Sequence, residues 1–308
     1  MFAIDVLPEP PSWVHLARKL PQTRKTCKPT PPENSDSSYT LASFGAEEYF
    51  EWAYSDGTQI VIDIAGQRLW GKFVPPLTLD DFAVYLRGPI MGFLLRRGGT
   101  TALHASTICT GGNAVVLCGP SQSGKSTTAA AMALRNVPIL SDDIAAVKSE
   151  NGSFQIEPGY SRLCLWPDAV QDLLGSPDAL PRLTPTWEKR FLPLDDSRAK
   201  FKSEKCPLGA IYLLASRVGD AHAPRFEEIS PREALLELVQ NTYMNWLLDA
   251  KLRAAEFDFL SRLVTTIPVR RVVPHSDPAR ITALCDLILA DAQRFPHPQN
   301  SASFVSTR

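Results

Sequence analysis

The sequence predicts an α/β protein with a small β-rich subdomain at its N-terminus. An apolar run, a glycine-rich loop, an Ala/Met/Leu segment and a second apolar run follow one another over residues 114–147, which indicates a strand–loop–helix–strand unit. Residues 39–75 instead alternate apolar and polar residues between turn formers, which indicates a small antiparallel sheet. We therefore expect an N-terminal subdomain over 1–95, a larger α/β domain over 96–293, and a disordered tail over 294–308.

The composition excludes several classes of protein. The chain has 308 residues, 44% of them hydrophobic, and its 32 basic and 33 acidic residues give a net charge of -1. Such a balance provides no basic surface for nucleic acid or for an anionic membrane. No apolar run approaches the roughly 20 residues that span a bilayer, and the first residues do not resemble a secretion signal. The six cysteines are scattered without a CxxC pair, so we expect reduced thiols in a cytoplasmic protein.

The N-terminal region predicts three kinds of segment. Residues 20–38 are rich in Pro, Ser and charge, and are expected to form an irregular linker. The sheet of residues 39–75 follows. Thr78 can then cap a helix that ends at a break at Gly88-Pro89.

The central block contains three apolar runs in quick succession. Residues 101–109 and 114–118 are predicted strands joined by a Gly-Gly turn, and a helix over about 125–135 leads to a strand over 137–147. Asn151-Gly152 is typical of a tight hairpin turn.

The last third of the chain predicts two strands and two capped helical regions. They are a buried strand over 208–216, a helix that starts in a capping box at Ser230 and runs to about 265 with an interruption near Asp249, a strand over 269–273, and a helix from Pro278 to about Gln293 capped by Asp277.

The loop between the predicted strand 114–118 and the helix after it matches a phosphate-binding pattern. The stretch "GPSQSGKS", residues 119–126 and called here the phosphate loop, fits G-x-x-x-x-G-K-[ST] between a buried strand and a helix. Such a loop turns its N–H groups toward an anion, while Lys125 reaches phosphates and the Ser126 hydroxyl reaches magnesium. The alternative is a chance match in an ordinary strand–turn–helix. The predicted nucleotide-binding residues are Gly119, Ser121, Gln122, Ser123, Gly124, Lys125, Ser126 and Thr127.

Three further residues are candidates for chemistry near the phosphate loop. Asp142 and Asp143 end an apolar run, where one carboxylate can bind magnesium and the other can accept a proton. The alternative is an Asp-Asp turn at a strand end. His104 lies in an apolar strand one hairpin before the loop, where a histidine is either a hydrogen-bonded core residue or part of a site.

Residues 100–147 resemble the catalytic core of HPr kinase/phosphorylase, and more closely the HPr-kinase-like proteins that phosphorylate lasso-peptide precursors. The shared order is histidine, strand, glycine-rich loop, helix and Asp-Asp, as in "LHAST…GGNAVVLCGPSQSGKSTTAAAMALRNVPILSDDIAAV". Weaker similarity extends through "DGTQIVIDIAG", "GYSRLCLWPDAV", "EKRFLPL" and "LGAIYLLAS". The resemblance implies a core akin to phosphoenolpyruvate carboxykinase, with ATP and Mg²⁺ as cosubstrates and a serine or threonine hydroxyl as acceptor.

The resemblance also implies roles for single residues. Lys125 would contact the phosphates and His104 would lie near the γ phosphate. The metal would be bound by Ser126, Asp142 and Asp143. One of the two aspartates would also be the base, and the resemblance does not say which. Arg162 matches the family's arginine in Glu-Ile-Arg-Gly-Leu-Gly only approximately, because Tyr160 stands where that motif has its glutamate. The loop of the phosphorylase partial reaction is missing, which favours a one-way kinase.

Basic residues after the core are candidates for neutralising the transferred group. Lys189 and Arg190 can contact the phosphoryl group or a carboxylate of the acceptor. The alternative is that they form a basic pair on a solvated loop. We predict a peptide substrate, with a lasso precursor implied by the resemblance, and a possible homo-oligomer. The alternatives are a kinase for a free amino acid or other small hydroxyl compound, and a nucleotide-binding regulatory ATPase.

Overall fold

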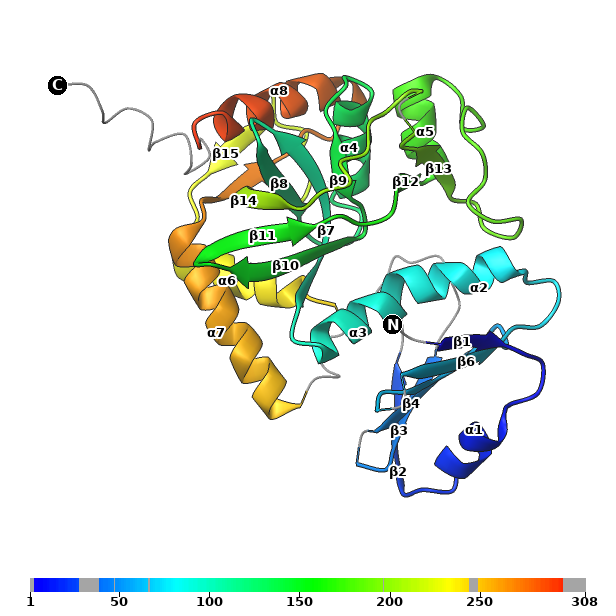
Figure 1. Ribbon diagram of the computed structural model, residues 1–308. Helices are drawn as coiled ribbons and strands as arrows, with labels where there is room; N and C mark the ends of the chain where they lie inside the picture. Colours follow the sequence, from blue (N-terminus) through cyan, green and yellow to red (C-terminus); the bar gives the residue numbers. More distant parts are fainter. Residues whose placement is uncertain are drawn as a thin grey trace. The chain divides into compact units, whose positions relative to one another are not determined.

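The chain folds into two compact units. The computed structural model describes residues 3–27, 39–46, 48–65, 67–195, 197–243 and 249–295 (Figure 1). One unit comprises the chain up to Tyr85 together with Thr184–Trp187, and the other comprises Leu86–Leu183 and the chain from Glu188 onward. Most of the predicted tail, residues 296–308, lies outside the described residues.

The first unit is a six-stranded sheet with two helices. β1 pairs with β6 in parallel, and the other neighbours are antiparallel. Val14 of α1 packs with Val61 and Trp70 of the sheet. The strand order is β1 (Ala3–Val6), β6 (Arg68–Lys72), β5 (Gln59–Asp63), β4 (Tyr49–Tyr54), β3 (Tyr39–Phe44) and β2 (Gln22–Cys27), and the helices are α1 (Ser12–Ala17) and α2 (Leu79–Tyr85).

The prediction of an irregular linker over residues 20–38 is wrong in its first part. Residues 22–27 form β2, which lies at the edge of the described sheet and pairs with β3, while residues 28–38 lie outside the described residues. The strand carries Arg24 and Lys25 and lacks an apolar alternation. Backbone pairing therefore defines it, and charged residues are common on edge strands because they oppose further pairing.

The helix expected at Thr78 is present. Thr78 Oγ1 accepts a hydrogen bond from Asp81 N at 3.4 Å, and Asp81 Oδ2 accepts one from Thr78 N at 2.7 Å. The predicted break at Gly88-Pro89 is wrong. Residues 86–90 form a π-helical turn, η1 (Leu86–Ile90), that leads into α3 (Met91–Arg97). The wider turn accommodates Pro89, which has no N–H to donate.

The second unit is built on a mixed sheet. β8 and β16 each run parallel to β14, and the other pairs are antiparallel. β11 also pairs with β14, which closes β10, β11, β14, β8 and β7 into a ring. The order is β11 (Ser153–Glu157), β10 (Ile144–Glu150), β7 (Thr101–Thr110), β8 (Asn113–Cys118), β14 (Cys206–Leu214), β16 (Val269–Val273) and β15 (Arg225–Glu227), with β9 (Ile139–Ser141) beside β7.

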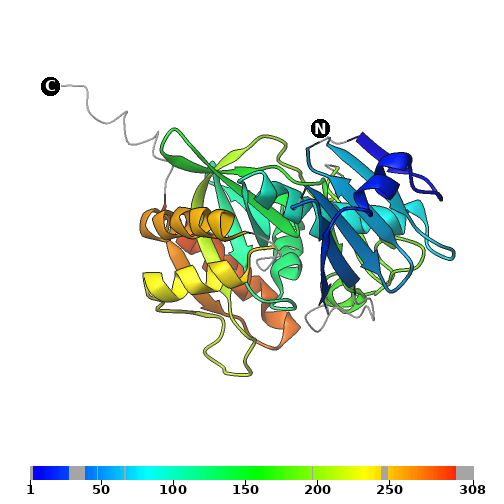
Figure 2. The ribbon, with the colours of Figure 1, turned by 90° about the horizontal axis from the view of Figure 1, so that it is seen from below.

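Helices cover both faces of this sheet. In β8, Val115 and Leu117 pack with α4 and α8, whereas Val116 and Cys118 pack in the cluster that contains α6 and α7. This alternation is typical of a strand buried on both faces. In both ribbon views α6 and α7 lie next to each other, in yellow and orange (Figures 1 and 2). The helices are α4 (Lys125–Ala133), α6 (Pro231–Gln240), α7 (Ala250–Thr266) and α8 (Ile281–Ala292), the last preceded by a 3₁₀ turn, η3 (Pro278–Arg280).

Most predicted elements of the second unit are confirmed. Asn151 and Gly152 have φ of +50° and +80°, as a tight hairpin turn requires. Ser230, Asp249 and Asp277 each accept a backbone hydrogen bond at the start of a helical segment. The residues just before Asp249, 244–248, lie outside the described ranges. An antiparallel pair of strands, β12 (Arg162–Leu165) and β13 (Arg190–Pro193), and the helix α5 (Pro167–Leu174) between them in sequence were not predicted.

The strand predicted over residues 137–147 is wrong as a single element. The chain forms two strands, β9 and β10, separated by Asp142 and Asp143. Asp143 has a φ of +69°, and a left-handed residue cannot continue an extended strand. The apolar run therefore contains a bend where its two carboxylates lie.

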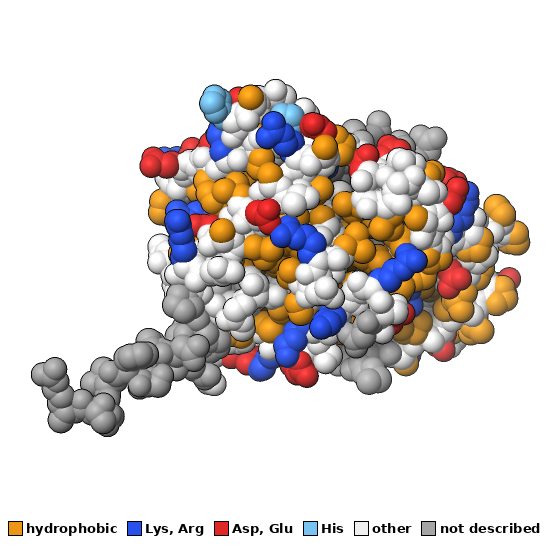
Figure 3. Space-filling view, turned by 90° about the horizontal axis from the view of Figure 1, so that it is seen from above, with side chains coloured by type: hydrophobic (Ala, Val, Ile, Leu, Met, Phe, Trp, Pro, Cys, Tyr) orange, Lys and Arg blue, Asp and Glu red, His pale blue; other side chains and the backbone are white. Residues whose placement is uncertain are grey.

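The surface and the helices agree with the balanced composition. None of the helices in the described ranges is long and apolar enough to cross a membrane. On the face shown in Figure 3, blue Lys and Arg side chains and red Asp and Glu side chains are interspersed.

Adding one methyl group to β6 is predicted to destabilise the first unit. A Cβ on Gly71 would lie 2.1 Å from Cζ of the Phe82 ring, so Gly71→Ala should cost about 1–3 kcal/mol of unfolding free energy, as overpacking does. Urea unfolding followed by tryptophan fluorescence measures this cost. Phe82→Leu removes the clashing atom, so the double variant should lose less than the sum of the single variants. If the losses of unfolding free energy in the two single variants simply added up in the double variant, the clash between residues 71 and 82 would be contradicted.

Candidate functional site

The phosphate loop connects the end of β8 to the start of α4. Its backbone turns through three positive φ angles, +149° at Gly119, +64° at Gln122 and +97° at Gly124. A Cβ on Gly119 would lie 2.6 Å from the Leu214 carbonyl oxygen, so the close approach of β14 requires glycine. Helix α4 begins at Lys125, where the free N–H groups of its first turn favour an anion.

Lys125 is folded back over the phosphate loop. Its side chain is buried, with 6% of the residue exposed, and Nζ donates to the carbonyl oxygens of Gly119 at 2.9 Å and Pro120 at 3.0 Å. Burial is the main cause that lowers the pKa of Lys125, and nearby carboxylates partly oppose it. A desolvated ammonium whose hydrogen-bond acceptors are neutral carbonyls is well placed to gain an anionic partner.

Asp142 connects the phosphate loop to two other segments, β7 and β12. Its Oδ1 accepts from Ser106 Oγ at 2.7 Å and from Ser126 Oγ at 2.8 Å, and its Oδ2 accepts from the backbone N–H of Cys164 at 2.8 Å. Burial raises the pKa of Asp142, while these hydrogen bonds act in the opposite direction. One carboxylate therefore fixes β7, α4 and β12 around the bend between β9 and β10.

The Asp143 carboxylate has different surroundings from the Asp142 carboxylate. Its side chain is 47% exposed, and Oδ1 lies 3.4 Å from His104 Nδ1. A Cβ on Gly88 of η1 would lie 3.2 Å from Asp143 Oδ2, so the backbone of η1 borders this carboxylate closely. The left-handed backbone at Asp143 lets two adjacent carboxylates have separate surroundings. The Asp-Asp bend considered as an alternative is thus part of the site geometry.

His104 is a neutral imidazole in this site. Burial is the main cause that lowers the pKa of His104 to about 4, the Asp143 carboxylate opposes the shift, and Lys125 and Lys189 add to it. Nδ1 also lies 3.0 Å from the Tyr243 hydroxyl. At neutral pH the ring therefore has one donor and one acceptor nitrogen.

The predicted basic residues differ in their surroundings. The Lys189 ammonium lies 5.0 Å from the centre of the Trp166 ring, and its charge reaches His104 and Lys125. Arg162 is half-buried in β12; burial raises the pKa of the neighbouring Cys164 to about 12, and the charge of Arg162 partly opposes this rise. Neither cation forms an ion pair among the residues that the structure describes.

Arg190 has a structural partner. Its side chain is 5% exposed, and Nη2 lies 2.7 Å from Asp178 Oδ1. The guanidinium also donates to the Glu188 carbonyl oxygen at 2.5 Å. The structure therefore groups Lys125, Ser126, Asp142, Asp143 and His104, with Lys189 and Arg162 nearby, and engages Arg190 elsewhere.

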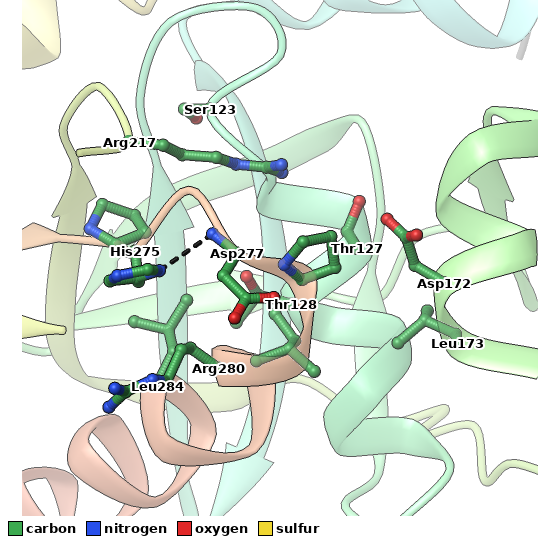
Figure 4. A pocket seen from close by; sticks show the side chains of 13 residues that line it. Ser123, Thr127, Thr128, Asp172, Leu173, Arg217, His275, Asp277, Arg280 and Leu284 are labelled. Atoms are coloured by element: carbon green, nitrogen blue, oxygen red, sulfur yellow. Dashed lines mark hydrogen bonds between the residues drawn. The ribbon is translucent and has the colours of Figure 1, made fainter. Parts of the chain in front are cut away.

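The remaining loop residues face outward or into a pocket. Ser121 and Gln122 are exposed, whereas Ser123 is 6% exposed and its hydroxyl has no hydrogen-bond partner in the described part of the chain. Ser123 lies in the loop just before α4, Thr127 lies in the first turn of α4, and both line the pocket of Figure 4. The site thus has two sides, with Ser126 facing Asp142 and Ser123 and Thr127 facing this pocket.

Arg217 lies over the start of α4 in the same pocket (Figure 4). Its Nη2 would be 2.7 Å from a Cβ on Gly124, so this glycine allows both the turn and the close approach of the guanidinium. His275 Nδ1 accepts from Asp277 N at 2.8 Å, the dashed line of Figure 4. The ring therefore has its proton on Nε2 when neutral.

Two residues of the site, Ser106 and Tyr243, were not predicted from the sequence. Ser106 stands two positions after His104, and the period of two in a strand places both side chains on one face of β7. That period was an available signal. Tyr243 follows α6 without any local motif, and only the tertiary structure brings it to His104.

The oxygen atoms at this site suit a magnesium ion that also binds phosphate. Mg²⁺ takes hydroxyl, carboxylate, phosphate and water oxygens, and is held by one or two carboxylates rather than by a full protein cage. The Ser126 hydroxyl and the Asp142 and Asp143 carboxylates supply such donors. The described residues include no cluster of three or more His, Cys, Asp or Glu able to hold a metal ion by themselves.

Comparisons with known proteins find similarity among solved structures. No protein-family model and no curated protein sequence matches the chain. Among solved structures, it is similar to the HPr(Ser) kinase/phosphatase from Coxiella burnetii, with 12% sequence identity and a TM-score of 0.35, over 63% of this chain and 97% of that one.

The low pKa of His104 predicts a loss of stability in mild acid. The unfolded histidine binds a proton near pH 6.5, whereas the folded one does so at about pH 4. Stability is therefore unaffected above pH 6.5 and falls as the pH drops from 6.5 to 4. An NMR titration of the imidazole should show no protonation of His104 down to pH 5.

A stability measurement on one variant tests the same effect of His104 on the pH dependence of unfolding. His104→Gln should be less sensitive than the wild type to a change from pH 7 to pH 5 in urea unfolding, because glutamine does not titrate. If the NMR titration gave His104 a midpoint near pH 6.5, the assigned effect of burial on its pKa would be wrong.

Proposed function

We propose that the protein is an ATP- and Mg²⁺-dependent kinase that transfers the γ-phosphoryl group to a serine hydroxyl of a peptide. The observation that carries this proposal is the hydrogen bond of 2.8 Å between Ser126 of the phosphate loop and the Asp142 carboxylate, with a second, half-exposed carboxylate on the next residue. A phosphate-binding loop alone serves many nucleotide-binding proteins. Transfer of a phosphoryl group to a hydroxyl also requires a carboxylate beside the loop that can accept the hydroxyl proton.

The different surroundings of the two aspartates assign one to metal binding and the other to proton acceptance. Asp142 is held by three hydrogen bonds and orients Ser126, so it is the carboxylate that supports the metal. Bound Mg²⁺ would supply charge neutralisation on the phosphate oxygens. Asp143 is half exposed, its Oδ1 lies 3.4 Å from His104 Nδ1, and its carboxylate accepts no hydrogen bond like those of Asp142 from the described residues, so it is the base.

The step itself conserves atoms and charge. The hydroxyl oxygen of the acceptor forms a bond to the γ phosphorus, and the bond from that phosphorus to the β–γ bridging oxygen breaks. The hydroxyl proton passes to the Asp143 carboxylate, and the products are ADP and a phosphoserine. Lys125 exchanges its carbonyl partners for phosphate oxygens. Lys189 and Arg162 add positive charge as negative charge spreads over the transferred group.

The rest of the nucleotide would extend along the other side of α4. Ser123 has a buried hydroxyl without a hydrogen-bond partner in the described ranges, and Thr127 and Arg217 line the same pocket. A hydroxyl in this position can donate to a phosphate or ribose oxygen.

The peptide acceptor is proposed from sequence resemblance. The resemblance is that of residues 100–147 and of the shorter segments after them to the kinases of lasso-peptide precursors. A lasso precursor with a C-terminal serine is therefore the substrate to test first.

An intact-mass experiment tests the proposal. Purified protein, Mg²⁺, ATP and the precursor peptide encoded beside the gene should give a peptide heavier by one or more phosphoryl groups, located on serine by fragmentation. Lys125→Ala should abolish the increment. Lys148→Ala is the matched control, because Lys148 pairs with Glu157 on β10 and β11 and is 43% exposed.

Two results would change the assignment. ATP consumption without a heavier peptide would direct the search to small hydroxyl acceptors or to a regulatory ATPase. An unchanged increment in Lys125→Ala would show that the phosphate loop is not the donor site.

Removing the proposed base should affect turnover more than nucleotide binding. Asp143→Asn keeps the size of the side chain but cannot take the proton, so kcat should fall by about 10²–10⁴-fold, while KM for ATP changes little. Steady-state kinetics with the phosphorylated peptide as product measures both constants. Asp168→Asn, an exposed residue of α5, is the control. Wild-type kcat in Asp143→Asn would exclude this residue as the base.

A further inference from the structure

Tyr243 is fixed in place by its backbone. Its N–H donates to the Ala102 carbonyl oxygen at 3.1 Å, and its own carbonyl oxygen accepts from the guanidinium of Arg96. Arg96 is a buried residue of α3, with 1% of its side chain exposed, and it also pairs with Glu256 of α7. Tyr243 is therefore attached to β7 on one side and to α3 on the other.

The ring of Tyr243 is packed as tightly as its backbone. A Cβ on Gly92 of α3 would lie 2.6 Å from Cγ of the ring, so only glycine at this position leaves room for it. The ring also meets the His104 imidazole edge-on, with 5.4 Å between the centres. Its hydroxyl is thereby directed to one place.

The hydroxyl lies between two groups of the site. Tyr243 Oη is 3.1 Å from the Asp143 carbonyl oxygen and 3.0 Å from His104 Nδ1. A phenol has one proton, and a carbonyl oxygen can only accept. Both hydrogen bonds can form only if the hydroxyl donates to Asp143 and accepts from a protonated Nδ1 of His104.

The second partner of this hydroxyl is a strained residue. Asp143 has a φ of +69°, and a residue other than glycine in such a conformation persists only where its surroundings hold it. Its carbonyl oxygen accepts from Ala105 N at 3.2 Å as well as from Tyr243. These two bonds hold the peptide group that directs the Asp143 carboxylate.

We propose that Tyr243 is a positioning residue, whose hydroxyl fixes His104 as the tautomer protonated on Nδ1 and holds the Asp143 backbone in its left-handed conformation. Nε2 of His104 is then the acceptor nitrogen of the ring. The consequence for turnover rests on the proposed kinase function, whereas the tautomer is a property of the protein by itself.

The tautomer can be measured without substrate. In protein labelled with ¹⁵N-histidine, a long-range ¹H–¹⁵N correlation spectrum identifies the protonated ring nitrogen, and His104→Gln assigns the His104 signals. We expect His104 to be protonated on Nδ1 in the wild type. In Tyr243→Phe this preference should be lost, because the remaining acceptor, Asp143 Oδ1, lies 3.4 Å away and is half exposed to water.

Two further variants separate positioning from general destabilisation. Tyr212→Phe removes a hydroxyl that donates to Asp291 at 3.0 Å in the same unit, so it loses a comparable buried hydrogen bond and should keep the His104 tautomer. Gly92→Ala keeps the hydroxyl but displaces the ring, and should change the tautomer as Tyr243→Phe does.

The kinetic measurement completes the test. Tyr243→Phe should lower kcat by about 10- to 100-fold, as loss of an orienting partner does, with KM for ATP little changed, and Tyr212→Phe should retain kcat. A wild-type His104 protonated on Nε2 would overturn the proposal. So would a Tyr243→Phe variant with an unchanged tautomer, or one with a changed tautomer and an unchanged kcat. If the wild type transfers no phosphoryl group to any acceptor while the tautomer responds as expected, the kinase function fails and the hydroxyl bridge stands.

Discussion

The hydrogen bonds of the Asp142 carboxylate are the interaction on which the rest of the site depends. A buried carboxylate is stable only where hydrogen bonds replace its water, and Asp142 receives them from Ser106 of β7, Ser126 of α4 and the backbone of Cys164 in β12. The burial that raises its pKa is therefore offset by the contacts that fix the phosphate loop. Three segments distant in sequence are held at one oxygen-rich point.

The left-handed backbone at Asp143 gives the second carboxylate a different role. Two adjacent residues of a strand point to opposite faces of the sheet, so a regular strand would place only one carboxylate at the phosphate loop. The bend at φ +69° keeps both near it and leaves Asp143 half exposed. Such a conformation costs on the order of 1–3 kcal/mol and requires support from its surroundings, which Ala105 and Tyr243 supply through the Asp143 carbonyl oxygen.

The charges of the site follow from burial. Burial lowers the pKa of both Lys125 and His104, and for His104 the ring is neutral at physiological pH. The cations near the phosphate loop include the ammonium groups of Lys125 and Lys189 and the guanidinium groups of Arg162 and Arg217. This arrangement suits a polyphosphate, whose own charge replaces the missing counter-ions.

The sequence by itself predicted the strand, glycine-rich loop and helix over residues 114–135 and indicated Lys125, Ser126, Asp142 and Asp143 as candidates, because a glycine pattern between a strand and a helix is a local signal. It also determined the capped helices at Ser230 and Asp277. Only the tertiary structure decided what each side chain does. The bend at Asp143 interrupts an apolar run that favours one strand, and Tyr243 reaches His104 across 139 positions of the chain. Arg190, next to Lys189 in sequence, is bound to Asp178. Such partners come from packing between distant segments, which no local pattern encodes.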